Sequence, residues 1–202
     1  MLHSCNRYDA RVDHDLLDAT QAVLAEHGAD GVSLERVAER ARRSRVTLWR
    51  QGVTKEDLIT GLLQRLTDDF QQEFWPVLNA TGSGRERLAD SFAALFEVAD
   101  RHIDLLAISD EVFHWAAERC DFPAGSEGFL APFIGALHLG KRDGSLAYEG
   151  RTEDTADVLF NAACWGYVHL RRRHRWSRKR ARAQLTEILL NGVASPNTHP
   201  AG

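Results

Sequence analysis

Long hydrophobic runs are missing from this sequence of 202 residues, and its apolar stretches fall well short of the ~20 residues that a membrane-spanning helix needs. Residues 1–6 also lack the apolar segment that is typical of a secretion signal. Cysteine is scarce, and the three thiols, Cys5, Cys120 and Cys164, are widely spaced and odd in number, which argues against a disulfide framework or a zinc cluster. We therefore expect a cytoplasmic protein that makes no contact with a membrane.

Motifs of catalysis and of metal binding are absent as well. The sequence has no Gly-x-Ser-x-Gly elbow, phosphate loop, His-Glu-x-x-His motif or Rossmann glycine motif, and its His and Cys residues show no tight ligand spacing. We expect neither enzymatic activity nor a metal or other cofactor. The formal net charge of -4 means that any binding of nucleic acid needs positive charge concentrated in one place.

Helical periodicity is what the chain does have, and the alternation that is typical of strands is lacking. The pattern predicts an all-α protein of nine or ten helices. Ser33 is placed to cap a helix, Thr54 with Asp57 resembles a capping box, and Gly28 is a natural terminator. The main expected helices cover residues 13–27, a short one from 33, 44–51, 54–75, one around 88–99, one from 103, 129–139, 153–170 and 177–193.

Positive charge is concentrated between residues 36 and 55, where a single acid, Glu39, accompanies seven basic side chains. Two short helices meet there at the tight corner of residues 41–44, and the second has few apolar side chains. This layout is typical of a helix-turn-helix, whose second helix enters the major groove of DNA. The alternative is the solvated face of a small helical bundle. The seven basic residues are Arg36, Arg40, Arg42, Arg43, Arg45, Arg50 and Lys55.

The segment from Ala41 to Leu58 resembles the signature of the tetracycline-repressor (TetR) family, roughly Ala-Gly-Val-Ser-x-x-Thr-Leu-Tyr-x-His-Phe-x-Ser-Lys-Glu-x-Leu. The similarity covers about residues 12–60. Outright matches are Ser44, Thr47, Leu48, Lys55, Glu56 and Leu58. The resemblance implies a three-helix DNA-binding head over residues 1–55, an effector-binding and dimerisation body over 56–194, and a disordered tail over 195–202.

The resemblance also implies roles for individual residues. Arg45 is expected to read guanine and Val46 to touch a thymine methyl, whereas Thr47, Trp49 and Lys55 are expected to hold phosphates. Leu48 and Leu58 are expected in the core. The full set of expected DNA contacts is Ser33, Arg43, Ser44, Arg45, Val46, Thr47, Trp49, Arg50, Gln51, Thr54 and Lys55.

Three residues depart from the family pattern. Arg42 stands where the corner usually has Gly, so we expect a side chain at a left-handed position. Gly52 replaces an aromatic residue that normally packs under the head. Trp49 replaces a Tyr and lacks its hydroxyl. These departures affect the expected operator sequence more than DNA binding itself.

For the body, the resemblance implies a homodimer on a palindromic operator of double-stranded DNA. The helices at 129–139 and 153–170 are the expected dimer interface. A small-molecule effector, largely apolar and of unknown identity, is expected among residues 62–170, and its binding would release the operator. The candidate ligand residues are Phe74, Trp75, Phe92, Phe96, His102, Phe113, His114, Trp115, Trp165 and His169, although for any single aromatic among them a plain core position is the better interpretation.

Two questions stay open from the sequence. The basic run of residues 171–182 is expected to be solvated and partly ion-paired at the junction of the last two helices, but a second site for an anionic partner is the alternative. The function we expect is that of a transcriptional regulator, most simply a repressor. The alternative is a helical small-molecule-binding protein that has lost operator binding.

Overall fold

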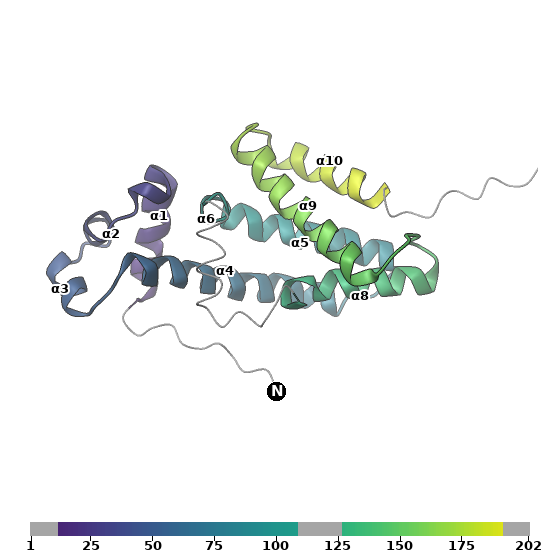
Figure 1. The fold of residues 1–202 in the computed structure, drawn as a ribbon, viewed down its shortest axis with the longest axis horizontal. Coiled ribbons are helices and arrows are strands. Elements are labelled where there is room, and N and C mark those ends of the chain that lie inside the picture. The colour runs from purple at the N-terminus through teal and green to yellow at the C-terminus, as the bar shows by residue number, and fades with distance from the viewer. Residues whose placement is uncertain (1–11, 109–126, 192–202) are drawn as a thin grey trace, which may run out of the picture. The chain divides into compact units, whose positions relative to one another are not determined.

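The computed structural model describes residues 12–108 and 127–191, and these contain nine α-helices and no β-strand. The predicted all-α class is confirmed (Figure 1). No helix in this part of the chain combines the length and the apolar character needed to cross a bilayer. The helices are α1 His14–Gly31, α2 Leu34–Arg40, α3 Arg45–Arg50, α4 Lys55–Leu78, α5 Gly84–Arg101, α6 Ile103–Leu106, α8 Glu127–Asp143, α9 Thr152–Arg172 and α10 Arg178–Asn191.

The described residues fall into two compact units. The first holds residues 12–68 and 102–108, with α1, α2, α3, α6 and the first part of α4, and the second holds residues 69–101 and 127–191. The first unit is built around apolar side chains that are each at most 2% exposed, and these include Leu48 and Leu58, which were expected in the core. The full set is Leu16, Leu17, Leu24, Val37, Leu48, Leu58 and Leu62.

Side chains cap α1, α2 and α4 of the first unit, and the caps at Ser33 and at Thr54 with Asp57 are the two that the sequence predicts. The Asp13 carboxylate accepts a hydrogen bond from the Leu16 amide at 3.1 Å at the start of α1. Thr54 and Asp57 form the reciprocal capping box, because the Thr54 amide donates to Asp57 Oδ2 at 2.9 Å and the Asp57 amide donates to Thr54 Oγ1 at 3.1 Å. Gly28 has a φ of 71° and interrupts α1, but the helix resumes and ends at Gly31, four residues after the predicted end at residue 27.

The second unit packs α5 against α8, α9 and α10 (Figure 1). Its interior is a lattice of aromatic rings, in which Phe133 lies next to Phe74, Phe92 and Phe160 with ring centroids 5.7 to 6.0 Å apart. The end of α8 fixes the start of α5, since Asp143 Oδ2 accepts a hydrogen bond from the Gly84 amide at 2.7 Å.

Candidate nucleic-acid interface

The corner between α2 and α3 is tight and is held by backbone hydrogen bonds. The Arg43 amide donates to the Ala38 carbonyl at 2.8 Å, and the Arg42 amide donates to the Glu39 carbonyl at 3.0 Å. Arg42 has a φ of 54°, in the left-handed region that normally favours glycine. The left-handed position expected at Arg42 from the sequence is therefore confirmed, and a charged side chain projects from the corner.

The end of α3 explains the unusual glycine at position 52. Gly52 has a φ of 69°, and its amide donates to the Trp49 carbonyl at 3.0 Å, so this residue ends the helix in a left-handed turn. The chain then brings Val53 into the core, where it is 3% exposed. Glycine here therefore provides a backbone conformation that the usual aromatic residue would adopt only with strain.

The two faces of α3 differ sharply in exposure. Leu48 is fully buried and anchors the helix to the first unit, whereas Val46 is 54% exposed and Trp49 is 75% exposed. An exposed tryptophan on a six-residue helix adds nothing to the core of its own unit, so it is available to a partner. The other exposed side chains of this helix and its ends are Ser44, Arg45, Thr47, Arg50, Gln51 and Thr54.

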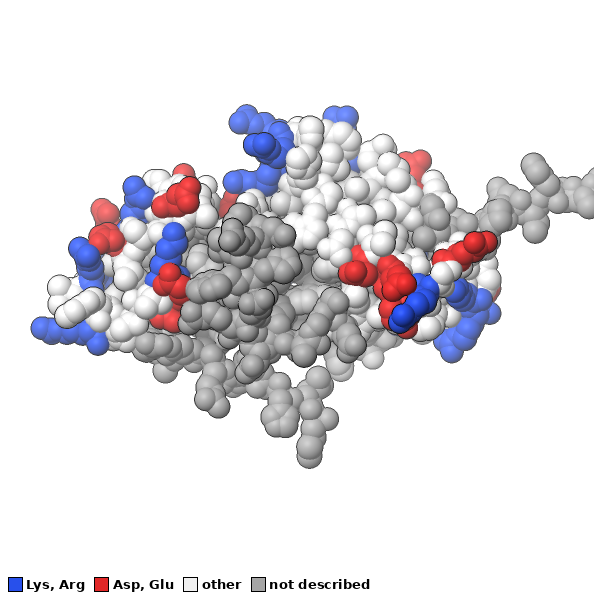
Figure 2. Space-filling model, in the orientation of Figure 1, with Lys and Arg blue, Asp and Glu red and all other residues white. Residues whose placement is uncertain are grey.

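Ion pairs hold several arginines of the first unit in place. Arg45 Nη2 lies 2.8 Å from Glu35 Oε1, and both side chains are more than half exposed. Arg43, by contrast, is partly buried and lies 2.6 Å from Asp13 of α1. Figure 2 shows the blue and red side chains mixed in this unit. Because an exposed pair is worth little in water, Arg45 can exchange Glu35 for another acceptor at small cost.

Ser33 and Lys55, two more of the expected DNA contacts, bond to backbone groups of the first unit. The Ser33 hydroxyl accepts a hydrogen bond from the Arg36 amide at 3.4 Å and caps α2. Lys55 Nζ donates to the Ala29 carbonyl at 2.9 Å, which ties the start of α4 to the end of α1. An ammonium group has three donors, so this bond leaves Lys55 able to contact a phosphate as well.

The residues expected at a ligand pocket lie in different surroundings. Phe74, Phe92 and Phe96 belong to the buried aromatic lattice of the second unit. His102 is buried in the first unit, and Trp75 is 68% exposed. Trp165 is half-buried and donates to Asn161, while His169 is exposed with its Nε2 3.2 Å from that of His174. Phe113, His114 and Trp115 lie outside the described residues.

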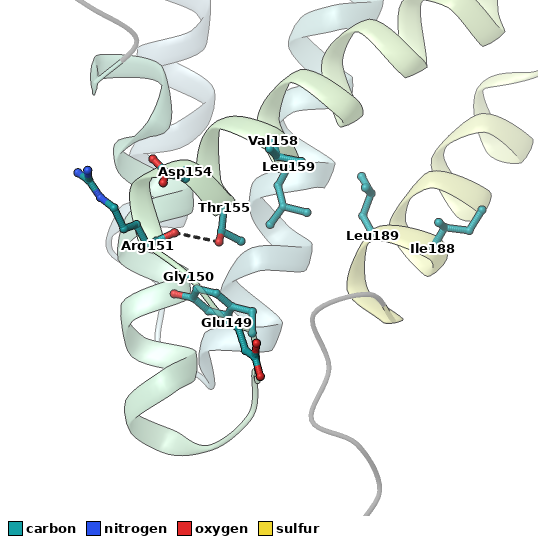
Figure 3. A pocket seen from close by; sticks show the side chains of 10 residues that line it. Glu149, Gly150, Arg151, Asp154, Thr155, Val158, Leu159, Ile188 and Leu189 are labelled. Atoms are coloured by element: carbon teal, nitrogen blue, oxygen red, sulfur yellow. Dashed lines mark hydrogen bonds between the residues drawn. The ribbon is translucent and has the colours of Figure 1, made fainter.

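A hollow of about 450 Å³ opens on the surface of the second unit instead (Figure 3). Four apolar side chains line it, Val158 and Leu159 from α9 and Ile188 and Leu189 from α10, together with the loop before α9. Val158 and Ile188 are both about two-thirds exposed. None of these four residues is among the predicted DNA or ligand contacts, because helical spacing alone does not tell an uncovered apolar face from a core-facing one. Val158 and Leu159 do lie on the helix of residues 153–170 that was expected at the dimer interface.

A buried carboxylate organises the junction of α5, α9 and α10, and sequence reasoning did not find it. The side chain of Asp100 is 2% exposed. It accepts hydrogen bonds from the Tyr167 hydroxyl at 2.6 Å, Arg182 Nη2 at 2.7 Å and Arg171 Nε at 3.1 Å. Burial by itself raises the pKa of Asp100, but the hydrogen bonds from Tyr167, Arg182 and Arg171 outweigh it and hold the pKa below its usual value.

The histidines and cysteines of the described residues were weighed as metal ligands and as reactive thiols. No group of three or more His, Cys, Asp or Glu side chains in this part of the chain is arranged to hold a metal ion. Burial raises the pKa of the Cys164 thiol to about 12, so this side chain stays protonated and unreactive near neutral pH. Cys5 and Cys120 lie outside the described residues.

Comparison with known proteins bears on the first unit and on the whole chain separately. Residues 16–62 match the family model described as bacterial regulatory proteins, tetR family. These residues run from α1 into α4 and include α3 with its exposed face. No curated protein sequence matches the chain.

Solved structures of transcriptional regulators share the fold. The ketosteroid transcriptional regulator KstR2 of Mycobacterium tuberculosis has a TM-score of 0.71 at 19% identity, over 94% of this chain and 98% of that one. The fatty acid degradation regulator FadR from Bacillus halodurans has a TM-score of 0.69 at 19% identity, over 87% and 93%. FadR from Bacillus subtilis, in complex with stearoyl-CoA, has a TM-score of 0.67 at 16% identity, over 88% and 97%.

Proposed function

Because the chain is a transcriptional regulator of the bacterial tetR family, we propose that it binds a palindromic DNA operator as a homodimer and releases it when a small molecule binds. The strongest support comes from α3. This short helix is anchored by the buried Leu48 and exposes Val46 and Trp49 on its outer face. The simplest direction of regulation for this protein is repression, since a protein bound to an operator obstructs transcription.

The DNA contacts follow from the exposed face of α3. Arg45 carries a planar guanidinium that fits the two acceptors of a guanine edge in the major groove, and Val46 offers a methyl contact to thymine. Thr47 and Trp49 hold phosphates through a hydroxyl and an indole N–H, and Arg50 and Lys55 add charge. In this proposal Arg45 leaves Glu35 on binding, which costs little because both groups are largely exposed.

A homodimer is supported by the uncovered apolar face of the second unit. Val158 on α9 and Ile188 on α10 are both largely exposed beside the same hollow. Burying this face against its symmetry copy removes apolar surface from water, as a two-fold interface does. We therefore assign the interface to α9 with α10. This keeps the helix of residues 153–170 from the pair that the sequence suggested and exchanges the helix of residues 129–139 for α10. Two reading helices about 34 Å apart then require a palindrome.

The proposed effector is largely apolar. The aromatic lattice around Phe74, Phe92 and Phe96 provides the apolar surroundings, and the related folds include a ketosteroid regulator and a FadR bound to stearoyl-CoA. Because these rings already contact one another, with Phe70 and Phe74 stacked at 4.0 Å, a ligand there has to repack them. Binding thereby favours a conformation whose heads no longer match the operator spacing.

A mobility-shift experiment with the intergenic DNA upstream of the coding sequence tests the proposal. The expected result is a shift that requires a palindrome, weakens steeply with salt and disappears when the right apolar ligand is added. Steroids and long-chain acyl-CoA thioesters are the first ligands to screen, by the rise in melting temperature that binding produces. A folded dimer that binds a ligand but shifts no DNA at low salt would instead be a small-molecule-binding protein without operator binding.

A further inference from the structure

The basic run at the turn between α9 and α10 divides into two sets of side chains. The inner set, Arg171, Arg178 and Arg182, faces the carboxylate of Asp100, at 3.1, 3.4 and 2.7 Å. The outer set consists of Arg173, Arg175, Lys179 and Arg180, which are all exposed. In the described ranges, 12–108 and 127–191, none of these four outer cations forms an ion pair with a carboxylate.

Two features of the turn run against ordinary local preferences. Arg175 has a φ of 54°, a left-handed conformation that a glycine would adopt more easily. The first turn of α10 contains no acid and instead begins Arg178-Lys179-Arg180, although the amino end of a helix carries partial positive charge and favours acids. Departures of this kind are expected where a surface serves a partner and not its own stability.

The outer cations form one positive surface. Figure 2 shows blue side chains gathered over the end of α9 and the start of α10, with little red among them. Arg180 lies over the Trp176 ring at 3.8 Å, which fixes its guanidinium in the patch. Arginine is suited to phosphate oxygens because its planar group donates two parallel hydrogen bonds, and the amino end of α10 adds attraction for anions.

We propose that the outer cations are a second DNA-binding surface, which holds backbone phosphates without regard to sequence. DNA is the polyanion that the head of this protein already brings near. A weak surface on a tethered unit acts at high effective concentration, so a few phosphate contacts there strengthen binding measurably. This surface lies outside the matched residues 16–62 and does not depend on how the head reads an operator.

The test uses the full-length chain and a fluorescent duplex of arbitrary sequence, with binding measured by anisotropy across a salt series. Arg175→Gly with Lys179→Gln removes two outer cations, and the glycine suits the left-handed backbone. The matched control, Lys141→Gln with Arg142→Gln, removes two exposed cations at the end of α8. Raising the salt from about 50 to 200 mM weakens DNA binding by both chains. The factor by which affinity falls should be about ten-fold smaller for the Arg175→Gly, Lys179→Gln variant than for the unmodified chain, because two phosphate contacts are gone.

The same variants in a chain with Arg45→Ala and Arg50→Ala separate this surface from the head. Residual duplex binding at low salt that the outer substitutions remove and the control substitutions leave supports the proposal. If the outer and the control substitutions change this residual binding equally, the proposal is overturned. It is also overturned if the folded chain with Arg45→Ala and Arg50→Ala shows no residual binding. Equal binding of the outer and unmodified chains to DNA, together with loss of binding to phosphatidylglycerol vesicles, overturns it in favour of a lipid surface. Loss of palindrome preference alone bears only on the head.

Discussion

Two arginine-rich regions of this protein use the same side chain for opposite purposes. At α3, Arg45 pairs with Glu35 on the surface, where both side chains are more than half exposed. At the α9–α10 turn, Arg171 and Arg182 converge on Asp100, whose side chain is 2% exposed. An exposed pair exchanges easily with water or another anion, whereas a buried carboxylate depends on the partners that it has. Burial of the acid, more than the number of arginines, decides which arginines are structural and which are available to a partner.

The largest expected effect is the loss of the buried carboxylate. Asp100→Asn removes the charge that Tyr167, Arg171 and Arg182 share, so we expect unfolding free energy to fall by about 3 kcal/mol. Urea denaturation followed by circular dichroism measures this change. Arg178→Gln is the control, because Arg178 is 63% exposed and its loss should cost less than about 0.5 kcal/mol. Equal costs for the two variants would abolish the distinction between the regions.

The second largest expected effect is a change in DNA binding with no change in stability. Arg45→Ala should leave the urea midpoint unchanged, since the ion pair of Arg45 with Glu35 is exposed. It should lower discrimination between the operator and a duplex altered at the contacted guanine by about 10- to 100-fold. Competition binding with the two duplexes measures this. Unchanged affinity and preference in a folded Arg45→Ala protein would mean that α3 is not the reading helix.

The pH dependence of stability sharpens the comparison further. Because the folded protein lowers the pKa of Asp100, its contribution to stability is complete above the usual aspartate value and is lost as the pH falls through the lower folded value. The stability difference between the unmodified chain and Asp100→Asn should therefore be constant above about pH 5 and should narrow below about pH 4. Urea curves at a series of pH values measure it. A difference that widens in acid contradicts the assignment.

The smallest expected effect concerns the surface pair at α3. Glu35→Gln removes the acid that competes with DNA for Arg45, so operator affinity should rise roughly two- to five-fold. Anisotropy at fixed salt measures the change. Glu39→Gln, which removes a neighbouring exposed acid for which no pairing with Arg45 is found, controls for net charge. A drop in affinity for Glu35→Gln would show that the pair positions Arg45 and does not restrain it.

Features set by nearby residues were predictable from the sequence. The Thr54–Asp57 capping box depends on residues only three positions apart. The left-handed Arg42 and the burial of Leu48 were predictable through the resemblance to the tetR signature. The Asp100 cluster was not predictable, because its partners lie about 70 to 80 positions further along the chain and only the packing of α5, α9 and α10 brings them together.

The apolar hollow between α9 and α10 was missed for a related reason. Val158 and Ile188 sit at helical spacing like core residues, and only the folded chain shows that both are about two-thirds exposed. The site residues expected from the family signature remain proposals, although the exposed face of α3 is arranged as they require.

Selection of duplexes from a random DNA pool by the unmodified chain tests the central claim most directly, namely that the outward face of α3 reads a palindrome. The account predicts an enriched palindrome whose half-sites lie about one helical turn apart, and loss of one fixed base position in each half when Arg45→Ala is used. A folded, dimeric chain that enriches no sequence at low salt would contradict it.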